Sequence, residues 1–164
     1  IALKSALVGK QNVKTYSFLE RGSDERQYCA PGIDLPVCGF CRSKYGEFPE
    51  YHTNADNFDL VTNKGLQGAF EVMKTIIQAF EFGLYPKVKI KGEPQLGKRN
   101  LYPTISQKGM YDSVKTRMDF LTYADGTNSL FQIVQIISAP LFLVLEEATI
   151  LYNNDLISIS DVPH

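Results

Sequence analysis

Residues 130–159 read LFQIVQIISAPLFLVLEEATILYNNDLISI, and this stretch decides the fold of the C-terminal third of the chain. Apolar residues recur in it at helical spacing, and residues 138–140 (SAP) separate two helices. The polar turn NND then leads into a short strand at residues 156–159. With one more helical pattern upstream, the order of three helices and a strand predicts a winged helix-turn-helix domain over residues 104–164.

Each of these helices has an apolar stripe that we expect to face a common core. The expected inward residues are Met110, Val114, Met118 and Leu121 in the first helix, Leu130, Ile133, Val134 and Ile137 in the second, and Leu141, Leu145, Ala148 and Leu151 or Tyr152 in the third.

The charge of the predicted winged helix argues against nucleic-acid binding. Residues 104–164 hold three basic and seven acidic side chains, and the stretch LFLVLEEATILY, which we expect to be the recognition helix, has two glutamates and no basic residue. A phosphate backbone would be repelled by such a helix. Its surplus of apolar residues at Phe142, Leu143 and Val144 favours a protein interface, with homo-oligomerisation as one form of it.

A long amphipathic helix is predicted for residues 62–82. Thr62 is a plausible N-cap, and Gly83 followed by Pro86 ends the helix. Its apolar stripe must pack on a surface, and the few strands nearby suggest that part of a larger sheet is missing. The stripe consists of Leu66, Phe70, Met73, Ile77, Phe80 and Leu84.

The first half of the chain is predicted to be the C-terminal portion of an α/β domain, residues 1–86. Its strands are expected at residues 13–19 (VKTYSFL) and residues 33–40 (IDLPVCGF). A basic linker, residues 87–103, then joins it to the winged helix; a solvated charge run is the common explanation for such a stretch.

The overall composition is that of an ordinary globular protein. The 164 residues carry a formal charge of −1, and no apolar run is long enough to span a membrane without polar interruption. Three cysteines are too few and odd in number for a disulfide framework, so a reducing compartment, the cytoplasm, is expected. The charge and the hydropathy predict neither a membrane nor a nucleic acid as partner.

The polar segment Arg42 to Asp56 (RSKYGEFPEYHTNAD) is the strongest candidate site. His52 could bind zinc through a neutral ring nitrogen if Asp56 fixed its tautomer, although composition alone favours a surface or hydrogen-bonded structural histidine. Cys29, Cys38 and Cys41 could join His52 in a Cys₃His zinc site. Buried cysteines that act as small apolar residues are the favoured alternative.

Three groups of residues together carry a family resemblance: Gly22-Ser23-Asp24, Gly32 to Pro36 (GIDLP), and Tyr51-His52-Thr53 with Asp56. They resemble the C-terminal part of the zinc-dependent aminopeptidase and glutamate carboxypeptidase superfamily, in particular its bacterial aminopeptidase-like branch. Glu93 to Pro103 (EPQLGKRNLYP) and the C-terminal winged helix extend the resemblance over almost the whole chain. It implies a partial αβα sandwich for residues 1–86.

The resemblance also implies a chemistry, namely peptide or small-amide hydrolysis at two zinc ions. His52 would be the last metal ligand, Tyr51 would stabilise the tetrahedral intermediate, and Asp56 would support the histidine. Asp24, in a loop near the active site of relatives, and Arg42 and Tyr45 are candidate substrate-pocket residues. Relatives commonly have a histidine where this chain has Glu25.

The number of histidines conflicts with a self-contained enzyme. Such a site needs two histidines and several carboxylates, whereas this chain has His52 and the terminal His164 only. We therefore expect the C-terminal part of a longer hydrolase, inactive alone, whose missing N-terminal part supplies most zinc ligands. The alternatives are a non-catalytic assembly module and, disfavoured by charge, a DNA-binding regulator.

Overall fold

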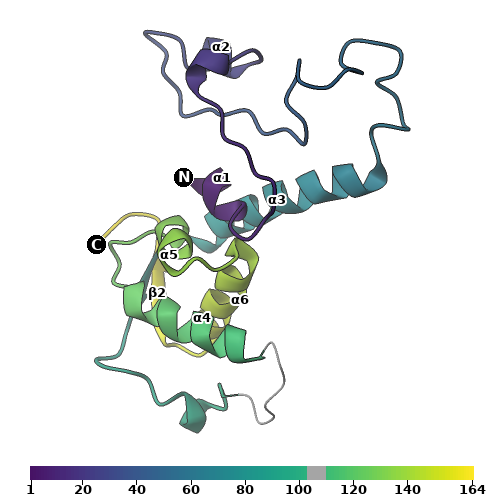
Figure 1. Ribbon diagram of the computed structural model, residues 1–164. Coiled ribbons are helices and arrows are strands. Elements are labelled where there is room, and N and C mark those ends of the chain that lie inside the picture. The colour runs from purple at the N-terminus through teal and green to yellow at the C-terminus, as the bar shows by residue number, and fades with distance from the viewer. Residues whose placement is uncertain (103–109) are drawn as a thin grey trace. The chain divides into compact units, whose positions relative to one another are not determined.

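The computed structural model describes residues 1–102 and 110–164 (Figure 1). Pro103, the first residues of the predicted winged-helix domain and the side chain of Met110 lie outside the described part. In chain order the elements are α1 (Ala2–Ala6), η1 (Phe18–Glu20), α2 (Glu25–Tyr28), α3 (Asn63–Phe82), β1 (Tyr85–Val88), η2 (Leu96–Arg99), α4 (Met110–Tyr123), α5 (Leu130–Ile137), α6 (Leu141–Asn153) and β2 (Ile157–Ser160).

The chain divides into two compact units that do not follow its linear order. One unit combines Ile1–Gln11 with Val72–His164, and the other is Asn12–Glu71. Below we call them the helical unit and the loop unit.

The helical unit is mostly α-helical and contains a winged helix-turn-helix domain. Helices α4, α5 and α6 follow one another, and β2 pairs antiparallel with β1, Tyr85 opposite Ser160 and Val88 opposite Ile157. The predicted strand at residues 156–159 is thus confirmed within one residue. Its partner β1 was not predicted because Pro86 interrupts the strand pattern; in the structure the Pro86 carbonyl accepts a hydrogen bond from the Gly126 N–H at 2.9 Å.

Local sequence signals set the helix ends as expected. Ser129 caps α5 in a capping box, with its hydroxyl accepting from the Gln132 N–H at 3.3 Å while the Gln132 side chain accepts from the Ser129 N–H at 2.8 Å. Ser138 then takes a left-handed conformation, and α6 begins just after Pro140. Gly83 ends α3 at φ +101°, where a Cβ would lie 2.3 Å from the Ile159 side chain.

The core of the helical unit lies between α4, α5, α6 and β2. Most of the residues expected inward on α5 and α6 are fully buried, while Ile137 and Leu145 are half-buried and Tyr152 is exposed. On α4 the expected residues Val114, Met118 and Leu121 are only half-buried, and Phe120, Arg117 and Thr116 are buried instead. The helix is therefore rotated from the face that its apolar spacing predicted.

A buried ion pair explains the orientation of α4. The Arg117 Nε donates to Glu147 Oε2 on α6 at 2.6 Å, and both side chains are almost completely buried. The same guanidinium donates to the Leu101 carbonyl, which fixes the segment after η2. Burial raises the pKa of the Glu147 carboxyl, and the Arg117 charge opposes that rise.

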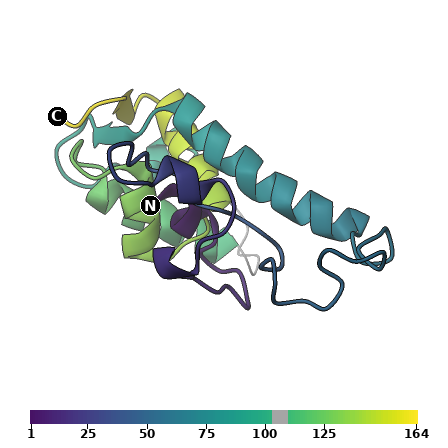
Figure 2. The same cartoon turned by 90° about the horizontal axis from the view of Figure 1, so that it is seen from above.

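Helix α3 has the predicted bounds but buries a different face. Thr62 acts as the expected cap, because its hydroxyl accepts from the Gly65 N–H at 3.1 Å. The buried residues are Val72, Ile76 and Ala79, and the C-terminal half of α3 runs beside α6 (Figure 2), with Phe82 and Tyr152 rings 5.9 Å apart. The predicted stripe remains largely exposed, so the surface that we expected to cover it is not found among the described residues.

The loop unit contains neither of the two predicted strands. Residues 13–17 have no regular secondary structure and lead into η1, which begins at Phe18, while residues 33–40 are turns and coil. A strand needs a neighbouring edge to bond with, and in this part of the chain the polar groups bond locally instead. The Cys29 thiol, for example, donates to the carbonyls of Leu35 at 3.3 Å and Val37 at 3.2 Å.

No residue of Asn12–Glu71 is buried. The expectation that the cysteines are buried is wrong, since Cys29 is partly exposed and Cys38 and Cys41 are exposed. The only strands in the described residues are β1 and β2, so this chain by itself does not form the predicted αβα sandwich.

Candidate functional site

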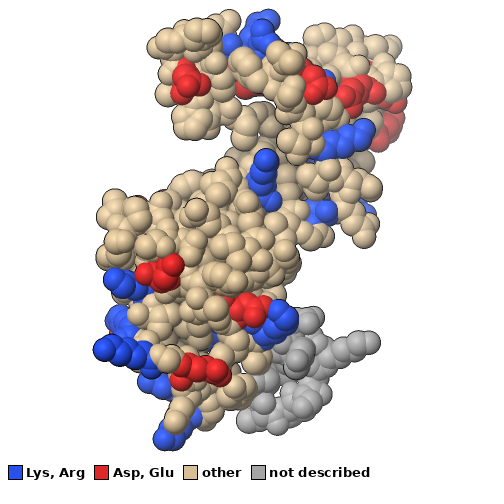
Figure 3. Space-filling view, turned by 60° about the vertical axis from the view of Figure 1, so that its left-hand side comes forward, with Lys and Arg blue, Asp and Glu red and all other residues tan. Residues whose placement is uncertain are grey.

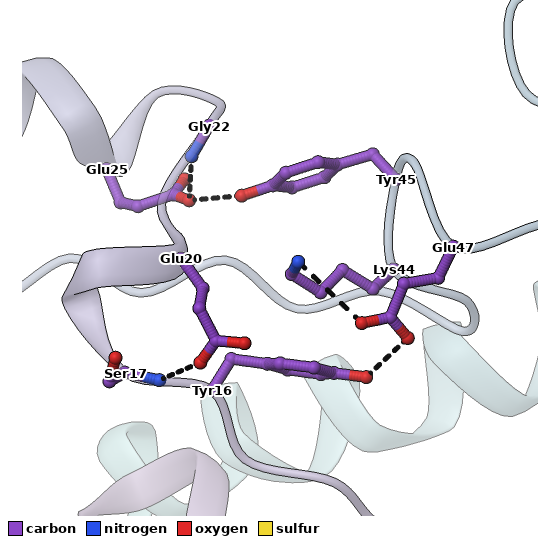
Figure 4. A network of polar contacts seen from close by, with 8 residues as sticks. All are labelled: Tyr16, Ser17, Glu20, Gly22, Glu25, Lys44, Tyr45 and Glu47. Carbon is purple, nitrogen blue, oxygen red and sulfur yellow. Dashed lines mark hydrogen bonds and ion pairs between the residues drawn. The ribbon is translucent and has the colours of Figure 1, made fainter.

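The candidate site lies in the loop unit, where two polar clusters tie distant loop segments together (Figure 4). The underlying turn is a second capping box. The Ser17 hydroxyl accepts from the Leu19 N–H at 3.3 Å, and Glu20 accepts from the Ser17 N–H at 3.0 Å. This box orders the backbone immediately after Tyr16.

The first cluster joins Tyr45 to Glu25. The phenol of Tyr45 donates to Glu25 Oε1 at 2.8 Å, and the Gly22 N–H donates to the same oxygen at 3.1 Å. These bonds favour the charged carboxylate, so the pKa of Glu25 is lowered and that of Tyr45 is raised. Gly22 makes the approach possible, because a Cβ there would lie 2.4 Å from the Tyr45 ring.

The second cluster surrounds Lys44. Tyr16 donates to Glu47 Oε2 at 2.8 Å, which raises the pKa of the Tyr16 phenol, and Lys44 Nζ lies 3.7 Å from Glu47 Oε1. The same ammonium lies 4.8 Å from the Tyr16 ring centroid and 5.4 Å from that of Tyr45. Lys44 therefore links the two clusters.

His52 and Tyr51 form an exposed aromatic pair. Their rings stack with centroids 4.0 Å apart and an interplanar angle of 21°, and the Phe48 ring contacts Tyr51 edge-on at 5.5 Å. The His52 backbone has φ +60°, in the left-handed region that few non-glycine residues adopt.

Asp56 is exposed in a turn that follows the pair. Its N–H donates to the Thr53 carbonyl at 3.2 Å, and the Thr53 hydroxyl donates to the Glu50 carbonyl at 2.7 Å. Among the described residues the structure records no hydrogen bond from His52 to Asp56, so the supporting role of Asp56 stays a prediction.

The three candidate substrate-pocket residues lie on different segments. Asp24 precedes α2 and is exposed, and Tyr45 belongs to the cluster described above. Arg42 is exposed, and its Nη1 lies 3.1 Å from where a Cβ of Gly68 on α3 would be. The structure thus brings only Tyr45 into a network, and the roles of Asp24 and Arg42 remain predictions.

Sequence reasoning assigned no role to Lys44 and Glu47, although both lie in the candidate segment, nor to Glu25, and it did not select Tyr16. Glu25 and Tyr45 are 20 positions apart, and Tyr16 and Glu47 are 31 positions apart. No periodicity links residues across such loops. The only sequence signal was that this chain has Glu25 at a position where relatives commonly have a histidine.

The donor groups present do not make a metal site by themselves. Over residues 1–102 and 113–164, whose side chains the structure describes, no three His, Cys, Asp or Glu side chains are placed to hold one ion. His52 offers one nitrogen donor, whereas a protein zinc site takes about three or four protein ligands. A zinc ion at His52 would need donors from outside the described residues.

Neither sign of charge dominates the face of the molecule drawn in Figure 3. On the face drawn in Figure 3, acidic and basic side chains are interspersed over a largely uncharged surface. None of the described helices is by itself long and apolar enough to cross a membrane; only the pair α5 and α6, bent by 118° at their junction, meets that length and composition together.

Two family models match the chain in succession. Residues 2–82 match a domain of unknown function (DUF4910), and residues 83–159 match a winged helix-turn-helix family. The second match agrees with the domain that the structure shows.

The relatives are peptidase-like in name and structure. A protein of Clostridium acetobutylicum named "Putative polysaccharide biosynthesis protein with aminopeptidase-like domain" is 41% identical over 118 residues, which is 71% of this chain and 27% of that protein. A crystal structure described as a "putative peptidase" from Clostridium acetobutylicum superposes with a TM-score of 0.72 at 30% identity, over 96% of this chain and 35% of that one. The chain thus resembles peptidase-like proteins and spans about a third or less of their length.

Proposed function

We propose that this chain is one part of an aminopeptidase-like hydrolase that cleaves peptides or small amides. The observation that carries the proposal is the superposition of 96% of the chain on a peptidase-like structure at 30% identity. The similarity therefore includes the loop unit with its candidate site and extends well beyond the winged helix.

Within this function, His52 supplies one ligand to zinc in a dinuclear site, and Tyr51 lies beside it as the oxyanion donor. Their direct stacking supports the pairing, because it places a phenol next to the proposed ligand. The remaining ligands come from a part of the polypeptide outside this chain, and alone the chain is inactive.

The experiment uses a chimera in which this chain replaces the matching segment of the Clostridium acetobutylicum relative. We expect about two zinc ions per chimera by elemental analysis, as two-metal hydrolysis requires, and cleavage of an aminoacyl amide. The isolated 164-residue chain should show neither stoichiometric zinc nor cleavage.

His52→Ala is the decisive variant, and His164→Ala is its matched control, since the chain has just these two histidines. We expect His52→Ala to lose at least one zinc ion and nearly all activity, and His164→Ala to keep both. Equal behaviour of the two variants would contradict the role of His52. Activity of the isolated chain would contradict its proposed dependence on other segments.

A non-catalytic assembly module is the second candidate, because the apolar stripe of α3 is exposed in this chain. A correctly folded chimera that holds no zinc and cleaves no amide would favour it.

A further inference from the structure

Helix α3 is apolar on two adjacent faces, and the structure covers only one of them. Val72, Ile76 and Ala79 are 6%, 9% and 0% exposed and pack in the helical unit. The second face is displaced by about 100°, the rotation between successive helical residues. Met73, Ile77 and Phe80 on that face are 45%, 57% and 51% exposed.

This second face has the regular spacing of a buried stripe. The three residues follow one another at steps of four and three, and Leu66 and Phe70 continue the same spacing toward the start of the helix. The Phe80 ring contacts that of Phe131 edge-on at 5.2 Å, yet half of the Phe80 side chain stays exposed. A helix that is apolar over about half of its circumference is typical of one packed between two layers.

We infer that the stripe of Met73, Ile77 and Phe80 is the docking face for the remaining polypeptide of an aminopeptidase-like protein, which forms the second layer over α3. The relatives provide the argument for this occupant, since this chain spans 27% and 35% of their lengths and leaves the larger part of each unmatched. The inference rests on the proposed function only in assuming such a longer polypeptide, and it requires neither zinc nor catalysis.

The charges of α3 favour a protein occupant over a lipid surface. Its remaining face holds Lys64 and Lys74 together with Glu71 and Glu81, two basic and two acidic residues. Helices that lie on anionic membranes are enriched in Lys and Arg on the polar face. An apolar stripe with a neutral polar face instead suits the inside of a layered protein.

The test compares the isolated chain with the chimera defined above by hydroxyl-radical footprinting. In the chimera the modification rates of Met73 and Ile77 should fall by roughly 10-fold, because burial removes most of their contact with water. Unchanged rates in a folded chimera would overturn the inference. If the chimera does not fold, the equivalent positions of the intact Clostridium relative can be footprinted instead. Reactive side chains at those positions would also overturn the inference.

Ile77→Glu and Ile136→Glu form a matched pair, since both replace an exposed isoleucine on a helix of the helical unit, 57% and 46% exposed. In the isolated chain neither should shift the unfolding midpoint much. In the chimera Ile77→Glu should lower the midpoint by at least ~5 °C, and Ile136→Glu should leave it nearly unchanged. Equal shifts in the chimera would overturn the inference.

Two other occupants of the stripe, a second copy of the chain and a membrane, can be tested with the same variant. If the isolated chain is a dimer by light scattering and Ile77→Glu makes it monomeric, the stripe binds a second copy. If the isolated chain floats with phosphatidylcholine and phosphatidylserine vesicles and Ile77→Glu abolishes flotation, the stripe binds a membrane. Either result overturns the inference, whatever the chimera's zinc content or activity.

Discussion

The helical unit and the loop unit contain similar kinds of residues but organise them differently. The helical unit buries a continuous set of apolar side chains, whereas the loop unit buries none, although it includes Phe18, Leu19, Phe58 and Tyr51. Phe58 is 90% exposed and Leu19 is 85% exposed. An apolar side chain stabilises a fold only where neighbouring elements provide a second surface against it.

The two units are therefore held together by different kinds of contact. Apolar packing is largely non-directional, and it lets α4, α5 and α6 close on their own core. The loop unit is connected by directional contacts between exposed polar groups, such as Tyr45 with Glu25 and Tyr16 with Glu47. Contacts of this kind contribute little net stability in water.

The largest expected effect tests the contrast in burial directly. Phe120→Ala removes a ring that is 0% exposed and should lower the free energy of unfolding by about 3–5 kcal/mol. Phe58→Ala makes the same change at a 90% exposed position and should alter it by less than ~0.5 kcal/mol. Urea denaturation followed by circular dichroism measures both, and similar losses would contradict the contrast.

A slightly smaller effect is expected at the ion pair that orients α4. Glu147→Ala leaves the Arg117 guanidinium buried without its carboxylate, and we expect a loss of about 3 kcal/mol in the free energy of unfolding. The double replacement Arg117→Met with Glu147→Leu removes both charges and should recover most of that loss. If the double variant is less stable than Glu147→Ala, the pair contributes more than the cost of burying it.

The smallest effect concerns the polar cluster of the loop unit. The folded pKa of Glu25 lies below its ordinary value, so its stabilising contribution is present above the ordinary carboxyl pKa and is lost as pH falls through the folded pKa. Tyr45→Phe removes the main cause, and the Glu25 pKa should rise toward the ordinary carboxyl range. NMR titration of the Glu25 side chain measures it.

Lys44→Met serves as the control for that titration. It removes the ammonium between the Tyr16 and Tyr45 rings but leaves the Tyr45 hydroxyl in place. The Glu25 pKa should stay depressed in this variant. A depressed value that persists in Tyr45→Phe would show that the backbone N–H groups of Glu25, Gly22 and Ser23 are sufficient to hold the carboxylate.

The sequence predicted most where local signals agree with one another. Ser129, Gln132, Ser138 and Pro140 define the ends of α5 and α6, and their apolar spacing identifies the inward residues. It predicted less well in residues 13–19 and 33–40, because β-propensity cannot produce a strand without a partner strand. For the candidate site it selected Tyr45 and the His52 and Tyr51 pair, but not the carboxylates and lysine around them.

By itself the sequence determined the three helices of the winged domain, the bounds of α3 and the acidic character of the recognition helix, because caps, periodicity and charge act within a few residues of one another. Only the tertiary structure decided which face of α3 is covered, how α4 is rotated and which phenols meet which carboxylates. Those choices depend on contacts between residues far apart in the chain, and on a free-energy balance between burial and pairing that no local pattern contains.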